Sequence, residues 1–322
     1  MKLCRGFDAV PADFGPCALT IGNFDGVHLG HRKILRRLVA IAGERGWKSA
    51  ALTFDPHPTV VVAPARTPLL LTSPERRAEL MASEGVDQVL ILPFTPELAA
   101  LSPEAFVRDL VVGRLGAKAV LVGEDFHFGQ AQSGDVHMLA ELGSQAGFET
   151  EIVGAVMCRG RSVSSSAIRE LLPAGSVSLA ARFLSGAYAI EGDVVGGHGI
   201  GSKQTVPTLN LQTAAEIVPA PGVYATRTRD LSDGREWNSV TNVGYRPTFG
   251  GDDQLTIETY LLDPFDGRNP ARIRVAFLRR MREERKFASV EELKARILKD
   301  VRAAQAYFRR LAGWTSRPLV TE

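Results

Sequence analysis

The sequence predicts an α/β protein in two parts: a Rossmann-like domain on a parallel sheet, then a small six-stranded antiparallel β-barrel with a C-terminal helix. Short apolar runs alternate with helical patterns over the first half of the chain. Near residue 185 the helical patterns stop, and short runs separated by Gly, Pro and Asp take over. At 322 residues the chain is also long for one compact domain. We therefore expect two domains, 1–185 and 186–322.

Five strands are expected in the first half, each on a short apolar run: 17–21, 48–54, 88–94, 118–123 and 149–156. Helical spacing of apolar residues predicts helices near 31–45, 74–84, 103–115 and 135–146. In the first helix the apolar residues of one face are Ile34, Leu35, Leu38, Ile41 and Ala42. Strands that alternate with helices in this way are typical of a parallel sheet with crossover connections.

Six short strands are expected in the second half: 189–195, 207–212, 222–229, 236–243, 255–262 and 271–279. Because no helical pattern separates them, they predict an antiparallel barrel. A capping box of Ser289 and Glu292 predicts the start of the final helix. The residues that this helix is expected to bury are Leu293, Ile297, Val301, Ala304 and Phe308.

Composition indicates an ordinary globular protein, with 45% hydrophobic and 23% charged residues. The net charge of +2, from 38 basic and 36 acidic residues, argues against nucleic acid as the main partner. The three cysteines, Cys4, Cys17 and Cys158, form no C-x-x-C pair, so a disulfide framework or a structural zinc site is not expected. The chain shows no signal peptide or membrane span, which favours the cytoplasm. Its oligomeric state stays open.

The stretch from Gly22 to His31 joins the first predicted strand to the first helix. A helix start offers unpaired N–H groups and a positive dipole end, and glycine lets a ligand approach the backbone. His28 and His31 add donors that can carry positive charge. Two surface histidines are the alternative interpretation, but their pairing in a Gly-rich turn favours a phosphate-handling site.

Polar segments follow the other predicted strands, at the edge where ligands bind in such sheets. They are Asp55-Pro56-His57-Pro58, Glu124 to Gly129 and Ser164 to Arg169. For Asp55 and His57 a flavin or phosphate contact is no better supported than a capped turn. Four segments that converge on one edge predict a site, whereas each alone would be a loop.

These motifs carry a family resemblance. G-N-F-D-G-V-H-L-G-H (22–31), L-T-F-D-P-H-P (52–58), G-E-D-F-H-F-G (123–129) and S-S-S-A-I-R (164–169) resemble the prokaryotic bifunctional riboflavin kinase/FAD synthetases. The similarity continues in P-T-L-N (207–210), P-G-V-Y-A (221–225), N-V-G-Y-R-P-T-F-G-G (242–251), E-T-Y-L-L-D (258–263) and R-E-E-R-K-F (282–287). It covers nearly the whole chain, and the motifs occur in the family's order.

The resemblance implies that the N-terminal half is an FMN adenylyltransferase of the H-x-G-H nucleotidyltransferase type. The phosphate of FMN would attack the α-phosphorus of ATP and expel pyrophosphate, which gives FAD. His28, His31 and Arg169 match the family's catalytic phosphate-binding residues. The residues implied to bind ATP here are Gly22, Asn23, Phe24, Gly30, Asp125, Ser165 and Ser166.

The resemblance also implies a riboflavin kinase in the C-terminal half, with ATP as co-substrate and Mg²⁺ as cofactor. Thr208 and Asn210 match the family's metal ligands, and Glu258 matches the base that takes the proton of the ribityl 5′-hydroxyl. By the alternation of a strand, Glu258 would otherwise be a solvated carboxylate. The implied ATP contacts are Gly197, Gly199, Gly201 and Lys203, and Arg282 is placed near the flavin, although it could equally belong to a solvated charge run.

The loop from Gly197 to Asn210 departs from the family pattern. Ile200 and Ser202 stand where arginines are usual, and Leu209 replaces an alanine between Thr208 and Asn210. We expect an active kinase with altered ATP affinity or flavin preference. The alternatives are an FAD synthetase with an impaired kinase module, a flavin- or nucleotide-binding regulator without turnover, and a nucleotidyltransferase for another substrate, which would not need the barrel.

Overall fold

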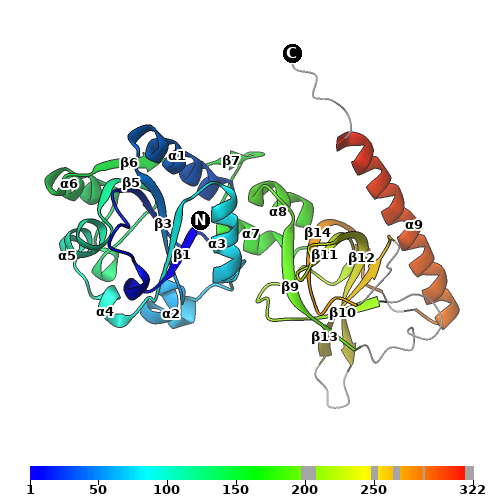
Figure 1. Cartoon of the computed structure of the whole chain (residues 1–322). Coiled ribbons are helices and arrows are strands. Elements are labelled where there is room, and N and C mark those ends of the chain that lie inside the picture. The colour runs from blue at the N-terminus through cyan, green and yellow to red at the C-terminus, as the bar shows by residue number, and fades with distance from the viewer. Residues whose placement is uncertain (197–207, 248–252, 264–268, 286, 316–322) are drawn as a thin grey trace. The chain divides into compact units, whose positions relative to one another are not determined.

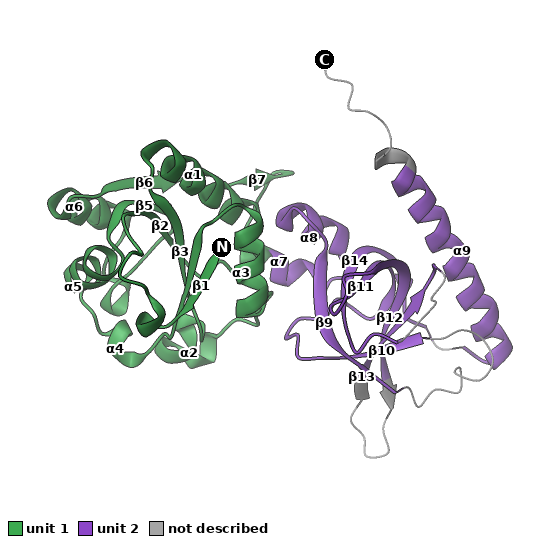
Figure 2. Ribbon diagram, in the orientation of Figure 1, with its two compact units in different colours: residues 1–167 green, residues 168–322 purple. Residues whose placement is uncertain are grey.

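The structure is a computed structural model, and it describes residues 1–196, 208–247, 253–263, 269–285 and 287–315. Contacts divide the chain into two compact units (Figure 2): unit 1 spans residues 1–167, and unit 2 spans residues 168–322.

Unit 1 contains a six-stranded parallel sheet in the order β1-β4-β3-β2-β5-β6. Its strands are β1 Lys2–Arg5, β2 Cys17–Ile21, β3 Lys48–Phe54, β4 Gln88–Leu92, β5 Ala117–Gly123 and β6 Glu149–Val153. The five predicted strands are confirmed. β1 was not predicted, because it is a four-residue edge strand in which only Cys4 is buried. A short hairpin of β7 Met157–Cys158 and β8 Arg161–Ser162 follows the sheet.

The predicted helices of unit 1 are present as α1 Leu29–Arg45, α3 Pro74–Ser83, α5 Pro103–Ala105, which continues as the π-helical segment Phe106–Arg114, and α6 Val136–Ala146. Short helices α2 Pro58–Val62 and α4 Pro96–Ala99 and the 3-10 turns Phe7–Ala9, Pro64–Arg66 and Gln130–Gln132 complete the unit. Of the predicted apolar face of α1, all five residues are buried.

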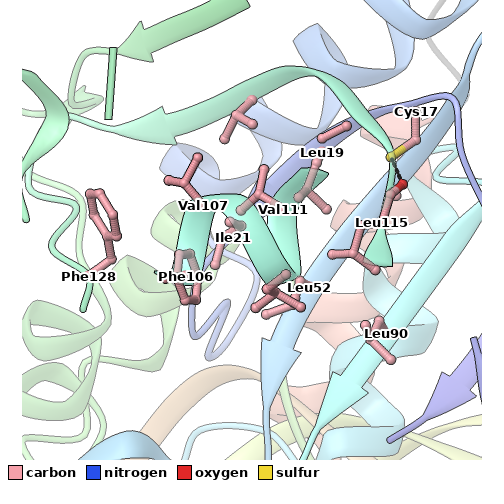
Figure 3. Packing of buried hydrophobic residues seen from close by; sticks show 14 of the residues in the cluster. Cys17, Leu19, Ile21, Leu52, Leu90, Phe106, Val107, Val111, Leu115 and Phe128 are labelled. Atoms are coloured by element: carbon pink, nitrogen blue, oxygen red, sulfur yellow. Dashed lines mark hydrogen bonds between the residues drawn. The ribbon is translucent and has the colours of Figure 1, made fainter. Parts of the chain in front are cut away.

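Both faces of the sheet are covered, which explains why its strands are continuous apolar runs. On one face Leu19, Ile21 and Leu52 pack with Phe106 and Val107 (Figure 3). On the other face alternate strand residues pack with α1; they include Ala18, Ala51 and Leu121. Cys17 lies at the base of β2, where its Sγ donates to the carbonyl oxygen of Leu115 at 3.3 Å. Burial raises the pKa of this thiol to about 12.

Unit 2 contains a closed antiparallel barrel in the strand order β10-β13-β12-β11-β14-β9. The strands are β9 Tyr188–Val195, β10 Thr208–Thr213, β11 Gly222–Asp230, β12 Glu236–Pro247, β13 Asp253–Leu261 and β14 Arg272–Glu283. The prediction of a six-stranded antiparallel barrel is confirmed. Helices α7 Ser165–Leu171 and α8 Val177–Leu184 precede it, and Ser178 Oγ of α8 donates to the carbonyl oxygen of Leu278 in β14 at 3.0 Å.

The interior of the barrel is lined partly by hydroxyl groups. Thr226, Thr228, Ser239, Thr241 and Thr259 are all fully buried. Thr226 Oγ1 lies 2.8 Å from both Ser239 Oγ and Thr241 Oγ1, Thr228 Oγ1 lies 2.8 Å from Ser239 Oγ, and Thr241 Oγ1 lies 2.9 Å from Thr259 Oγ1. Small hydroxyl side chains fit the narrow barrel and satisfy one another's hydrogen bonds, as buried polar groups must.

The C-terminal helix α9, Val290–Thr315, packs along the outside of the barrel (Figure 1). Its predicted cap is present, since Ser289 Oγ accepts the N–H of Glu292 at 3.1 Å. Ala304 and Phe308 are buried against Val223, Ala225 and Val240. The prediction that Leu293 is buried was wrong, because this side chain is 39% exposed, and Ile297 and Val301 are only half-buried. Leu293 lies about 16 Å along the helix from Ala304, away from the cluster that buries Ala304 and Phe308.

Candidate functional site

The turn between β2 and α1 holds the two histidines together. His28 is the N-cap of α1, and its Nδ1 accepts the N–H of His31 at 3.4 Å. The two imidazole rings stack with centroids 3.7 Å apart, and the ring of Phe24 meets His31 edge-on at 5.1 Å. Because Nδ1 of His28 accepts, the neutral ring carries its proton on Nε2. The turn therefore presents a defined donor at the start of a helix.

Gly30 makes this stacking possible. A Cβ at Gly30 would lie 3.1 Å from Cε1 and 3.2 Å from Nδ1 of His28, which is tighter than ordinary contact. The glycine between the two histidines thus lets the His28 ring lie against the backbone of α1.

His31 does not carry a positive charge readily. Its Nδ1 is buried, and no described residue offers it a hydrogen bond. Burial first, and then the charges of His28 and Arg77, hold the pKa of His31 well below its ordinary value of 6.5. The sequence predicted donors that can carry positive charge at both histidines, and the lowered pKa of His31 disfavours that charge at this residue.

The turn lies where the order of the sheet reverses. From β2 the chain adds β3 and β4 on one side and β5 and β6 on the other. A ligand crevice is expected between the carboxyl ends of β2 and β5. Asp125 follows β5, and its Oδ1 would lie 2.9 Å from a Cβ at Gly123. The same Cβ would lie 3.9 Å from Cδ1 of Ile34 in α1, so Asp125 and α1 both lie close to Gly123 at the end of β5.

Asp25, inside the turn, is a buried residue whose hydrogen bonds tie the turn to two distant segments, and the sequence did not predict this role. It is 1% exposed, and its carboxylate accepts the N–H groups of Leu71 and Thr72, each at 3.0 Å, and the Thr72 hydroxyl at 3.0 Å. Its carbonyl oxygen accepts the hydroxyl of Ser165 at 2.9 Å. Its position in a quoted motif was the only signal, because these partners lie 46 to 140 residues away in sequence.

The other residues predicted for adenylylation are partly in this turn and partly in or next to α7. Phe24 is 1% exposed and packs with Leu35 and Met81, while Gly22 and Asn23 are half-buried. Ser166 is exposed next to Ser165. Arg169 lies one helical turn after Ser165 in α7, but beyond the division between the units.

At the end of β3, His57 caps the short helix α2. Its Nδ1 accepts the N–H of Thr59 at 3.3 Å and lies 2.7 Å from the Thr59 hydroxyl. Asp55 is half-buried beside it. The structure thus shows the capped turn that was one of two interpretations, and a flavin contact stays a prediction for both residues.

Unit 2 brings two of the predicted kinase residues, Asn210 and Glu258, into one row across the barrel. Asn210 of β10 lies opposite Glu258 of β13, and Glu258 lies opposite Asn242 of β12. Thr208 lies opposite Tyr260 on the same outer face, since Leu209, Ile257 and Thr259 are buried inside. Opposite residues in such a ladder have Cβ atoms about 5 Å apart. Sequence reasoning quoted the motif of Asn242 but did not select this residue.

Arg282 continues this row, since it lies opposite Val223, which lies opposite Asn242. Its guanidinium is held by Asp300 of α9, with Nε at 2.9 Å and Nη2 at 2.8 Å from the carboxylate. Asp300 is 5% exposed and also contacts Arg296 at 3.1 Å. Arg282 therefore fastens α9 to the barrel, and its contact with the flavin stays a prediction. Gly197, Gly199, Gly201 and Lys203 lie outside the described residues.

Two further observations concern the residues that the structure describes. Among the described residues, no group of three or more His, Cys, Asp or Glu side chains could hold a metal ion. In the same part of the chain, no helix is both long and apolar enough to span a membrane.

Comparisons with known proteins agree with this arrangement. The family model for FAD synthetase matches residues 10–167, and that for riboflavin kinase matches residues 184–308. A bifunctional riboflavin kinase/FMN adenylyltransferase of Pseudomonas fluorescens is 40% identical over 95% of this chain and 97% of its own length. The protein of the same description from Escherichia coli K12 is 36% identical over 96% of this chain and 98% of its own.

A solved structure described as a macrolide-efflux protein from Streptococcus pneumoniae has a TM-score of 0.83. It is 24% identical and covers 95% of this chain and 99% of that one, which shows a shared fold. Both family models and the full-length relatives lead to the same assignment. The chain belongs to the bifunctional riboflavin kinase/FMN adenylyltransferase family.

Proposed function

We propose that this enzyme makes FAD from riboflavin in two steps at two separate sites. Riboflavin is phosphorylated on the outer face of the barrel, in a kinase domain 186–322, and FMN is adenylylated at the Gly22–His31 turn, in a domain 1–185. The observation that carries the proposal is the presence of two separate constellations: the stacked histidines after β2, and the row of Asn210, Glu258 and Asn242.

For adenylylation, a phosphate oxygen of FMN attacks the α-phosphorus of ATP, a new P–O bond forms, and the bond to pyrophosphate breaks. The protein's part is to align the two phosphates and to stabilise the charge that develops on them. The His28 Nε2–H, neutral His31 and the first N–H groups of α1 supply donors, and Arg169 supplies a fixed positive fork. The proposed ATP contacts in this domain are Gly22, Asn23, Phe24, Gly30, Asp125, Ser165 and Ser166.

For the kinase step, Glu258 accepts the proton of the ribityl 5′-hydroxyl while that oxygen attacks the γ-phosphorus of ATP and ADP leaves. Asn210 and Asn242, on the strands at either side, hold the carboxylate in position. Gly197, Gly199, Gly201 and Lys203 are proposed to contact ATP, and Arg282, with Asp55 and His57 in the other domain, to lie near the flavin.

Both activities use ATP, generally with a divalent metal, and we propose that Mg²⁺ fills this role in the kinase. The donors fit: Thr208 and Asn210 offer a hydroxyl and an amide oxygen two residues apart on one strand face, and Glu258 is opposite Asn210. Mg²⁺ prefers oxygen ligands and usually takes a few from the protein and the rest from phosphates and water. When bound, it would neutralise charge on the phosphates of ATP.

We also propose a cytoplasmic location. Its support is that all three cysteines are free thiols, as reducing compartments favour. Cell fractionation with an antibody against the chain tests it, and recovery from the periplasm or the medium would contradict it.

The proposed division of labour is tested by one variant in each site of the full-length protein. His28→Asn keeps a helix cap but removes the ring, and it should lower FAD formation from FMN by at least about 100-fold. Glu258→Gln should lower FMN formation from riboflavin by at least about 100-fold. Each variant should leave the other activity unchanged. His137→Asn, at an exposed position of α6, and Glu236→Gln, at an exposed position of β12, are the matched controls. Loss of both activities from either site variant would contradict the division.

A further inference from the structure

Arg77 is a buried charge in unit 1 that neither proposed reaction uses. It lies on α3 and is 2% exposed, between neighbours such as Ala78 and Met81 that are buried as apolar side chains should be. Burial of a guanidinium carries a large desolvation cost before its interactions are counted. A methionine would fill this position without that cost, so packing alone does not explain an arginine here.

The guanidinium reaches the end of β3. Its Nη1 donates to Thr53 Oγ1 at 3.0 Å and to the carbonyl oxygen of Phe54 at 3.2 Å. Thr53 is fully buried, and its hydroxyl donates to the carbonyl oxygen of Asn23 at 3.0 Å. A hydroxyl has one proton and two lone pairs, so Thr53 can accept from Arg77 while it donates to Asn23. A chain of two hydrogen bonds therefore links α3 to the first residues of the histidine turn.

That turn needs such support. Phe24 has φ 49° and Val27 has φ 41°, and the left-handed conformation is unfavourable for any residue other than glycine. Such a backbone persists only where the surrounding structure fixes it. Asn23 is anchored through Thr53 and Arg77, and Asp25 is anchored through Leu71 and Thr72. Both anchors lead back to residues 71–77, the first of them through Thr53. They hold Asn23 and Asp25, the residues on either side of the strained Phe24.

We propose that Arg77 is a positioning residue for FMN adenylylation: through Thr53 and the carbonyl of Asn23, it holds the Gly22–His31 turn in the conformation that stacks His28 on His31. The inference rests on the proposed placement of adenylylation at this turn. Arg77 acts through the turn, and no contact with ATP or FMN is assigned to it.

The charge of Arg77 also affects the pKa of His31, an effect that packing alone would not produce. The groups whose charges act on His31 are His28, in the same turn, and Arg77, from α3; both lower the pKa of His31, after burial. The Phe24 ring also contacts His31, in a T-shaped arrangement with centroids 5.1 Å apart. A guanidinium keeps its proton throughout the physiological range. Arg77 thus helps to keep His31 neutral, and loss of its charge should raise the pKa of His31.

The test compares variants of the full-length enzyme in both of its reactions. Arg77→Met and Thr53→Val should lower kcat for FAD formation from FMN by about 10- to 100-fold, because misplacement of aligned groups has effects of this size. The KM for ATP and the rate of FMN formation from riboflavin should stay near wild type. Thr53→Ser, which restores the hydroxyl, should recover most of the loss relative to Thr53→Val, and Arg77→Lys part of the loss relative to Arg77→Met. Arg76→Met, on the same helix but paired with Glu79 at the surface, is the matched control.

The second readout is the titration of His31 by NMR, with its signal assigned from the spectrum of His31→Asn. Arg77→Met should raise the pKa of His31 relative to wild type, whereas Arg76→Met should not. Where Arg77→Met fails to fold, the Thr53→Val and Thr53→Ser pair decides, since both leave Arg77 in place.

Two outcomes would overturn the inference. One is a folded Arg77→Met enzyme with the kcat and the His31 titration of wild type. The other is a loss that strikes FAD and FMN formation equally and follows the loss of thermal stability. Failure of the inference about Arg77 can be distinguished from failure of the proposed adenylylation site. If His28→Asn is inactive in FAD formation and Arg77→Met is fully active, only the role of Arg77 is wrong. If His28→Asn is active, the placement of adenylylation at the turn is wrong.

Discussion

Glu258 of β13 and Asn210 of β10 lie directly opposite each other in the antiparallel ladder of the barrel. This pairing brings the carboxylate of Glu258 next to the amide of Asn210, which lies 48 residues earlier in the sequence. In sequence the two residues belong to unrelated motifs, and only the closure of the barrel makes them neighbours. The pairing therefore gives one site to the proposed base and the proposed metal ligands.

Asn242 completes the row on the other side of Glu258, and we expect it to orient the carboxylate. Hydrogen bonds to charged groups contribute about 1.5–3 kcal/mol, so Asn242→Ala should lower kcat for FMN formation by about tenfold or more. FAD formation from supplied FMN should not change. Asn238→Ala, on the same strand but outside the row, is the control. Equal rates of FMN formation in the two variants would show that Asn242 has no such role.

The buried hydroxyls of the barrel predict a stability effect without a direct effect on catalysis. Thr226→Val removes the hydroxyl that contacts both Ser239 and Thr241, and an unsatisfied buried partner costs about 1–3 kcal/mol. The free energy of unfolding in urea should fall by this amount. It is measured by the fluorescence of Trp237 in a protein in which Trp47 and Trp314 are replaced by Phe. Thr226→Ser, which keeps the hydroxyl and loses one methyl group, should cost less. A Val variant as stable as wild type would mean that the network contributes no stability.

The lowered pKa of His31 predicts how unit 1 responds to acid. Below the ordinary pKa of 6.5, the unfolded chain binds a proton at His31 that the folded chain does not bind. The stability contributed by the neutral side chain is therefore present above pH 6.5 and is lost as the pH falls below it. Amide hydrogen exchange in β2 and β3, converted to opening free energies at about pH 7.5 and about pH 5.5, measures this loss. It should be smaller in His31→Asn than in wild type and unchanged in the surface variant His137→Asn. The same loss in all three proteins would refute the prediction.

The sequence predicted the architecture because the patterns that mark strands and helices are formed by residues close together in the chain. Continuous apolar runs marked the buried strands, and the change of texture near residue 185 marked the start of the barrel strands. It missed β1, which has too few buried residues to show a pattern, and it placed Leu293 in the core because helical spacing does not reveal where a partner surface ends.

The residues that support the sites were less predictable than the motif residues. Asp25 and Asn242 also stand in motifs that carry the resemblance, but their roles depend on partners far away in sequence, which no motif reveals. Arg77 stands in Glu75-Arg76-Arg77, a run of charged residues of the kind that is mostly exposed. Its neighbour Arg76 does lie at the surface, and only the packing of α3 shows that Arg77 points inward.

The most direct test of two independent sites in one chain is complementation between single-site variants. Neither His28→Asn nor Glu258→Gln alone should make FAD from riboflavin and ATP, because each lacks one step. A mixture of the two proteins should make FAD, since FMN released by the first can be adenylylated by the second, whereas the doubly substituted protein should make none. If the mixture makes no more FAD than its components, although each keeps its own half-reaction, the sites are not independent and the account is wrong.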